Sequence, residues 1–188
     1  PSDLQVPGAE HLITSDQFLE LDELPPSLVF VGGGFISFEF AHVAARAGAR
    51  VTIVHRGSRP LAHFDPDLVD QLVERSRGLG IDVLLETDVT AVSPARDGFI
   101  VRTSTHGALG EIGAHAVVHG AGRVPEIDDL NLDGAGISWD TRRGVAVNEF
   151  LQSVSNPAVY AAGDAAASGG PRLTPVAGHD AHRAQHIA

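Results

Sequence analysis

The chain has 188 residues, 43% of them hydrophobic, and a formal net charge of −11. This length and composition allow one large domain, or one domain with part of another, around a sizeable core. There is no signal-peptide pattern, and no apolar run approaches the roughly 18 residues that span a membrane. Basic residues form no run, so we expect no extended nucleic-acid or anionic-membrane binding, which relies on clustered positive charge. We expect a soluble, cytoplasmic protein.

Cysteine, lysine and methionine are absent from the sequence. Without cysteine the chain has no disulfide, no thiolate metal site and no cysteine nucleophile. Without lysine it has no phosphate-loop lysine and no Schiff base, so arginines and backbone N–H groups must hold any bound phosphate. Because the chain opens at Pro1 without an initiator methionine, we interpret it as a piece of a longer protein; removal of the initiator is the alternative.

The first half of the sequence alternates predicted strands and helices. Ser15 predicts the N-cap of a short helix that ends near Leu21. Asp65, followed by Pro66 at the first helical position, predicts the start of a later helix; the nearby Asp67 and Asp70 favour its positive end and solubility. Buried strands are expected at residues 28–31, 50–54 and 81–85, and long helices at 35–47 and 66–79. This order is typical of the mononucleotide-binding half of a doubly wound parallel sheet.

The pattern changes after this unit. Two short alternating segments, 89–93 and 99–104, are separated by Asp97-Gly98, a strong hairpin signal. With residues 111–112 they predict an antiparallel three-stranded meander. A last core strand is expected at 115–119. The fold class is therefore α/β, a Rossmann-like parallel sheet with an antiparallel three-stranded meander.

A glycine loop, Gly32-Gly33-Gly34-Phe35-Ile36-Ser37, joins the first predicted strand to its helix. Gly32 permits the tight turn, and Gly34, lacking a Cβ, lets a pyrophosphate approach the backbone. The third position needs a small residue for helix–strand packing, and Ser37 fills it. Free N–H groups and the positive helix end then hold the phosphates. The strand–loop–helix–strand context predicts a dinucleotide site; the alternative is a glycine-rich turn without a ligand.

The second predicted strand ends at Val54-His55-Arg56. An NAD site usually has Asp or Glu there for the ribose 2′-OH, whereas an NADP site has a nearby Arg for the 2′-phosphate. No acid occurs between Val51 and Phe64, while Arg56 and Arg59 do. The sequence therefore favours NADPH over NADH, with His55, Arg56 and Arg59 at the site. The alternative is that both arginines are ordinary surface charges.

Further motifs follow in a fixed order along the chain. They are Ile13-Thr14-Ser15-Asp16, Leu24-Pro25, the glycine loop with Glu39, Gly122-Arg123-Val124-Pro125, Tyr160-Ala161-Ala162-Gly163-Asp164 and Leu173-Thr174-Pro175-Val176-Ala177. In this order they resemble the class I pyridine nucleotide–disulfide oxidoreductases, flavoproteins that include glutathione reductase and mercuric reductase. The resemblance covers nearly the whole chain.

The resemblance implies two domains, an NAD(P)-binding domain at residues 1–123 and the incomplete C-terminal part of an FAD-binding domain at 124–188. It implies that the intact enzyme passes hydride from NADPH (or NADH) to FAD and on to a disulfide or similar acceptor. It also implies a homodimer at full length, formed through a domain absent from this chain. The chain alone would then be inactive.

Particular residues match the family's site. Phe35 matches an aromatic gate over the flavin, with an ordinary core residue as the alternative. Glu39 matches a glutamate beside the nicotinamide, with a solvated helix glutamate as the alternative. Arg56 matches an arginine on the 2′-phosphate.

Residues after position 121 match further motifs of the family. Gly122 and Arg123 belong to its Gly-Arg-x-Pro motif. Asp164 matches an acid that hydrogen-bonds the flavin's ribityl chain, and Gly163 lets the ligand approach. Thr174 would begin a helix whose positive end faces the flavin pyrimidine.

Other interpretations stay open. Glu126 stands where the family motif has Asn, and Ser37 where it has Gly. A reductase of the same fold without a redox disulfide (NADH oxidase or ferredoxin reductase-like) or a non-catalytic nucleotide-binding module would share these residues. His179, His182 and His186 fall at i, i+3 and i+7, the spacing of a shared helix face that could bind Zn²⁺ or Ni²⁺. We favour a polar helix face there and expect no metal.

Overall fold

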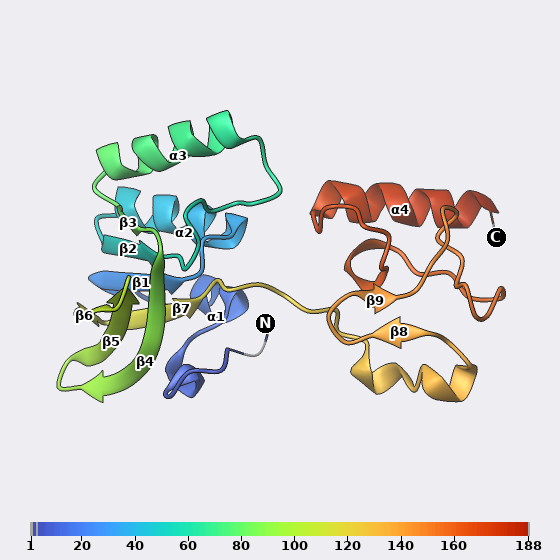
Figure 1. The fold of residues 1–188 in the computed structure, drawn as a ribbon, viewed down its shortest axis with the longest axis horizontal. Coiled ribbons are helices and arrows are strands. Elements are labelled where there is room, and N and C mark those ends of the chain that lie inside the picture. Colours follow the sequence, from blue (N-terminus) through green and yellow to red (C-terminus); the bar gives the residue numbers. More distant parts are fainter. Residues whose placement is uncertain (1, 3, 188) are drawn as a thin grey trace. The chain divides into compact units, whose positions relative to one another are not determined.

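The computed structural model describes residue 2 and residues 4–187, apart from the side chains of 186 and 187. It divides into two compact units, Pro1–Gly122 and Arg123–Ala188 (Figure 1). No helix among the described residues is long and apolar enough to cross a membrane. Unit 1 contains the short 3-10 turn η1 (Ala9–His11), helices α1 (Ser15–Leu19), α2 (Phe35–Arg46) and α3 (Pro66–Gly78), and strands β1 (Ser27–Val31), β2 (Arg50–Val54), β3 (Asp82–Leu84), β4 (Thr87–Ala95), β5 (Gly98–Thr105), β6 (Ala108–Ala114) and β7 (Ala116–His119).

A parallel sheet of order β3-β2-β1-β7 forms the centre of unit 1. Strand β1 pairs in parallel with β2 on one side and with β7 on the other. All of β1 is buried and its residues 28–31 are all apolar, because both faces of the sheet are covered. The predicted Rossmann-like sheet is confirmed.

The two faces of this sheet are covered by different layers. Leu28 and Phe30 pack into the cluster that contains Phe38 of α2 and Val69 of α3. The alternate residues of β1 point into a second cluster, which is shared with the antiparallel sheet. Figure 1 accordingly shows α2 and α3 on one side of the parallel sheet and β4, β5 and β6 on the other. The carboxyl end of β1 is therefore fixed between two packed layers.

The antiparallel sheet has the order β4-β5-β6, so the predicted meander is confirmed. Its first turn consists of Arg96 and Asp97, and Gly98, the first residue of β5, has a φ of 124°. The strands are longer than predicted, above all β6, for which the sequence indicated only residues 111–112. This edge strand contains Gly110 and Gly113 and is mostly exposed, so its alternation of apolar and polar residues is weak. Its bounds are set instead by its pairing with β5.

The predicted cap of α1 is wrong by one residue. Thr14, not Ser15, is the N-cap, since its side chain accepts a hydrogen bond from Gln17 N at 3.2 Å. Gln17 Oε1 accepts from Thr14 N at 2.8 Å and completes a capping box. Glutamine three residues after threonine is the signal that places the cap at Thr14.

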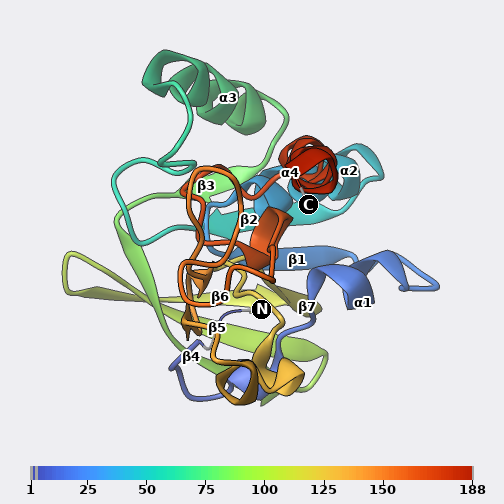
Figure 2. The same cartoon turned by 90° about the vertical axis from the view of Figure 1, so that its right-hand side faces the viewer.

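Unit 2 contains two short strands, β8 (Trp139–Asp140) and β9 (Gly144–Val145), the 3-10 turns η2 (Asp128–Leu130), η3 (Asp133–Ala135) and η4 (Gly163–Ala165), and helix α4 (Thr174–Ile187). Figure 2 shows α4 end-on. A small cluster, which includes Ile127, Leu132, Ile137 and Val145, forms its core. The helix predicted from Thr174 is present.

Candidate nucleotide-binding site

The glycine loop follows β1 directly and is tied to both neighbouring strands. Gly32 N donates to Val54 O of β2 at 2.8 Å, and Gly120 N, just beyond β7, donates to Val31 O at 2.8 Å. The loop therefore lies at the carboxyl edge of the parallel sheet, where open α/β sheets bind their ligands.

The three glycines of the loop differ in how far the fold itself requires them. Gly32 has a φ of 108°, and a Cβ there would overlap the backbone of Gly120. A Cβ on Gly33 would lie 2.8 Å from the His55 ring and from Pro60 Cβ. Gly34 differs, because its φ is −86° and a Cβ would meet only Gly120 O, at 3.4 Å. The fold needs glycine at the first two positions, whereas Gly34 leaves space that the protein itself does not fill.

The amino terminus of α2 presents unused donors. Gly34 is its N-cap and provides no side-chain cap, and the helical bonding begins with Phe38 N to Gly34 O at 3.2 Å. The N–H groups of the first turn therefore have no side-chain acceptor in the described chain. Together with the positive end of the helix dipole they favour an anion.

His55 binds the protein backbone with both ring nitrogens. Its Nδ1 accepts from Gly33 N at 3.2 Å, and its Nε2 therefore carries the proton and donates to Arg59 O at 3.0 Å. The N–H of Gly33 is thus already used and is not one of the free donors that the sequence predicted. His55 connects the glycine loop to the loop that follows β2, a role that the sequence pattern did not indicate.

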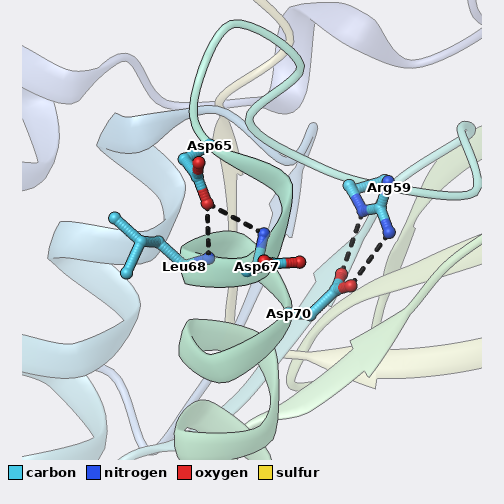
Figure 3. A network of polar contacts seen from close by, with 5 residues as sticks. All are labelled: Arg59, Asp65, Asp67, Leu68 and Asp70. Atoms are coloured by element: carbon cyan, nitrogen blue, oxygen red, sulfur yellow. Dashed lines mark hydrogen bonds and ion pairs between the residues drawn. The ribbon is translucent and has the colours of Figure 1, made fainter.

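The two arginines after β2 differ. Arg56 is exposed and has no ion-pair partner among the described residues. Arg59 forms a bidentate ion pair with Asp70 of α3, at 2.9 Å from Nε to Oδ1 and 2.9 Å from Nη2 to Oδ2 (Figure 3). Asp70 therefore does more than favour the helix end and solubility. Asp65 caps α3 as predicted, since its Oδ1 accepts from Asp67 N and Leu68 N.

The first turns of α2 divide into a buried and an open side. Ser37 and Phe38 are buried. Phe35 and Ile36 are only partly buried and belong to none of the apolar core clusters of the described residues. Glu39 is exposed and has no partner among the described residues.

Gly122 and Arg123 lie at the boundary between the two units. Gly122 has a φ of 118°, and its carbonyl accepts from Ser2 N at 3.0 Å. The Arg123 side chain is exposed, while its carbonyl accepts from Arg172 Nη1 at 2.8 Å within unit 2.

The flavin-side candidates belong to unit 2. Gly163 has a φ of 62°, and a Cβ there would lie 2.9 Å from Ala177 Cβ of α4. Its N–H donates to Asp180 Oδ2 at 3.3 Å, so a buried carboxylate of α4 holds the turn that carries Asp164. Asp164 is partly exposed, and Thr174 begins α4. Asp180 was not among the residues predicted from the sequence. An acidic residue one helical turn after the apolar Val176, on a helix that packs against the protein, is a signal that could have identified it.

A metal site finds no support in the described side chains, which contain no group of three or more His, Cys, Asp or Glu that could hold an ion. Of the three histidines on α4, the side chain of His186 lies outside the described residues.

Known proteins share this architecture. The chain is 36% identical to the glutathione reductase of Burkholderia cepacia over 177 residues, which cover 94% of this chain and 38% of that protein. It is 29% identical to the mercuric reductase of Lysinibacillus sphaericus over 182 residues, 96% of this chain and 33% of that one. The solved structure of the HOCl-induced flavoprotein disulfide reductase RclA from Escherichia coli matches with a TM-score of 0.82 at 28% identity, covering 97% of this chain and 41% of RclA.

The chain thus spans only 33% to 38% of these two curated relatives. The model of the pyridine nucleotide-disulphide oxidoreductase family matches residues 1–181. This match covers almost the entire chain, and the relatives agree with it. The chain therefore belongs to the pyridine nucleotide-disulphide oxidoreductase family.

Proposed function

We propose that this chain is the NAD(P)H-binding portion of an FAD-dependent oxidoreductase that delivers reducing equivalents to a disulfide or a similar acceptor. Residues 1–123 form the NAD(P)-binding domain, and 124–188 form the C-terminal part of the FAD-binding domain. FAD, when bound, supplies the redox chemistry. The acceptor site belongs to parts of the enzyme beyond these residues. The names of the relatives, glutathione reductase and flavoprotein disulfide reductase, support a disulfide acceptor.

The main support for this proposal is the unfilled space beside Gly34. Neither backbone conformation nor protein packing requires glycine there, since φ is −86° and the nearest atom to an added Cβ lies at 3.4 Å. Beside this space, the first N–H groups of α2 lack side-chain acceptors in the part of the chain that the structure describes. A pyrophosphate fits both features, because it needs close backbone approach and several N–H donors.

The remaining candidates define how the nucleotide is oriented. Arg56 binds the 2′-phosphate with an uncompensated charge, which favours NADPH over NADH. Phe35 and Glu39 are one helical turn apart on α2 and partly or fully open, so they can contact the nicotinamide end. His55 acts indirectly by holding Gly33. In unit 2, Gly163 and Asp164 contribute to the flavin side.

The direct test is NADPH titration by calorimetry of the 188-residue chain and its Gly34→Ala variant. Alanine fits the fold at this position, so the variant should keep its thermal midpoint. Its methyl group occupies the ligand space, and we expect NADPH to bind at least about tenfold more weakly.

Gly113→Ala is the matched control. Gly113 lies on β6, and an added Cβ there meets no atom within 4 Å. This variant should bind NADPH as the unchanged chain does. Equal affinity of the Gly34→Ala variant and the unchanged chain would remove the proposal, as would a chain that binds neither NADPH nor NADH.

A further inference from the structure

We infer that Asp70 is a specificity-determining residue, which lowers the preference for NADPH by neutralising Arg59 beside the 2′-phosphate position. The inference rests on the proposed function, because it needs the nucleotide to lie on the loop after β2. Asp70 touches no nucleotide itself. It acts through Arg59.

Arg59 is part of the nucleotide site through its backbone. Its carbonyl accepts from His55 Nε2 at 3.0 Å, and the same imidazole accepts from Gly33 N at 3.2 Å. Two residues later, Leu61 N donates to Gly33 O at 3.0 Å. The segment that carries Arg59 is therefore hydrogen-bonded to the glycine loop in two ways.

Asp70 is fixed on α3, the helix that follows this segment. It lies in the second turn of α3, which begins at Pro66. Figure 3 shows the Asp65 cap at the start of this helix and the Arg59–Asp70 pair beside it. Both of its oxygens accept from the Arg59 guanidinium at 2.9 Å. Two parallel charge-assisted bonds use the Nε–Nη2 edge of Arg59, the same edge that would bind a phosphate in bidentate fashion.

Asp70 and the 2′-phosphate compete for the positive charge of Arg59. Arg59 lowers the pKa of Asp70 by its hydrogen bond and its charge, so the pair is ionised at neutral pH. The Arg59–Asp70 pair as a whole has no net charge to offer a phosphate that carries about −1.5 to −2. Arg56 has no such partner in the described chain, so it binds the 2′-phosphate with its full charge. Removal of the Asp70 charge gives the site a second free arginine.

The pair can be opened without unfolding the protein. The side chains of Arg59 and Asp70 are 49% and 58% exposed, and exposed ion pairs contribute little to stability. We therefore expect Asp70→Asn to keep the thermal midpoint of the chain. This allows a binding measurement on a folded variant.

The experiment compares dissociation constants for NADPH and NADH, measured by calorimetry on the 188-residue chain, on Asp70→Asn and on Asp67→Asn. Asp67→Asn removes the same charge from the same helix, but Asp67 accepts no hydrogen bond from Arg59. For Asp70→Asn we expect NADPH to bind about three- to tenfold more tightly and NADH to change less than about twofold. For Asp67→Asn we expect a smaller gain. The gain should shrink at high ionic strength and vanish in Asp70→Asn combined with Arg59→Gln.

The possible outcomes distinguish a failure of the proposed function from a failure of the role of Asp70. A chain that binds neither coenzyme contradicts the proposed function itself. A chain that binds NADPH, but whose Asp70→Asn variant shows an unchanged ratio of NADPH to NADH affinity, overturns only the role of Asp70. Weaker NADPH binding by that variant would also overturn it, because Asp70 would then orient Arg59 toward the phosphate.

Discussion

Ser37 and Gly120 pack against each other so closely that a Cβ on Gly120 would overlap the Ser37 hydroxyl oxygen. Ser37 is fully buried on α2, and its hydroxyl has no hydrogen-bond partner among the described residues. Gly120 follows β7 and donates its N–H to Val31 O. Serine can therefore replace the third glycine of the loop because glycine stands opposite it.

This contact predicts opposite effects of two alanine substitutions. Gly120→Ala should lower the free energy of unfolding by about 1–3 kcal/mol, because the methyl group meets Ser37 Oγ. Ser37→Ala should raise it by up to about 1 kcal/mol, since it removes a buried hydroxyl without a partner. In the double variant the added Cβ has its nearest neighbours at 3.3 Å, so most of the loss should be recovered. Urea unfolding measures all four chains, and purely additive effects would contradict the contact.

Much of unit 1 could be predicted from the sequence, because its elements have strong local signals. The continuous apolar run 28–31 indicates β1, and Asp65 with Pro66 indicates the start of α3. The second hairpin turn was missed. It contains His106 at φ 50° and Gly107 at φ 86°, and a histidine in a left-handed conformation is uncommon.

The candidate residues of the site can be predicted from the sequence, whereas the hydrogen bonds that join them cannot. The pattern of the glycine loop and of Arg56 is local in the sequence. The bonds of His55 to Gly33 and of Arg59 to Asp70 join residues 22 and 11 positions apart. Such contacts depend on how β2 and α3 pack, so they cannot be predicted from composition or from the periodicity of the sequence.

Phe35 and Phe38 provide a comparison within one helix. Phe38 is 3% exposed and belongs to the core cluster between α2 and the sheet, while Phe35 lies outside every cluster of the described residues. Phe38→Ala should cost about 3–5 kcal/mol of unfolding free energy, whereas Phe35→Ala should cost less than about 1 kcal/mol. Denaturant unfolding distinguishes the two. Similar losses would show that Phe35 is an ordinary core residue and would withdraw its role at the nicotinamide.

His42 predicts a pH dependence of stability. Ser76 Oγ donates to Leu72 O at 2.7 Å, so it accepts from His42 Nε2 at 2.8 Å, and His42 Nδ1 faces Arg46. Burial, with the charges of Arg46 and Arg75, lowers the pKa of His42 from its ordinary value of 6.5.

The unfolded chain therefore takes up this proton before the folded chain does, and stability that is present above pH 6.5 is lost as the pH falls below it. His42→Gln keeps an N–H donor for Ser76 but does not titrate. Its unfolding free energy, measured by urea at several pH values from 7.5 to about 5, should fall less steeply than that of the unchanged chain. A slope equal to that of the unchanged chain would contradict the assignment.

Arg56 is the residue on which the choice of coenzyme depends most directly. It follows β2 at the carboxyl edge of the sheet, is exposed, and has no ion-pair partner among the described residues. Arg56→Gln should weaken NADPH binding about tenfold and leave NADH binding nearly unchanged, because only NADPH carries the 2′-phosphate. Arg102→Gln is the control, since it removes the same charge from β5, where Arg102 pairs with Glu111. Calorimetric titration of both coenzymes checks the prediction. Equal losses for NADPH and NADH would place Arg56 on a part of the nucleotide that both share and would overturn its role in the choice of coenzyme.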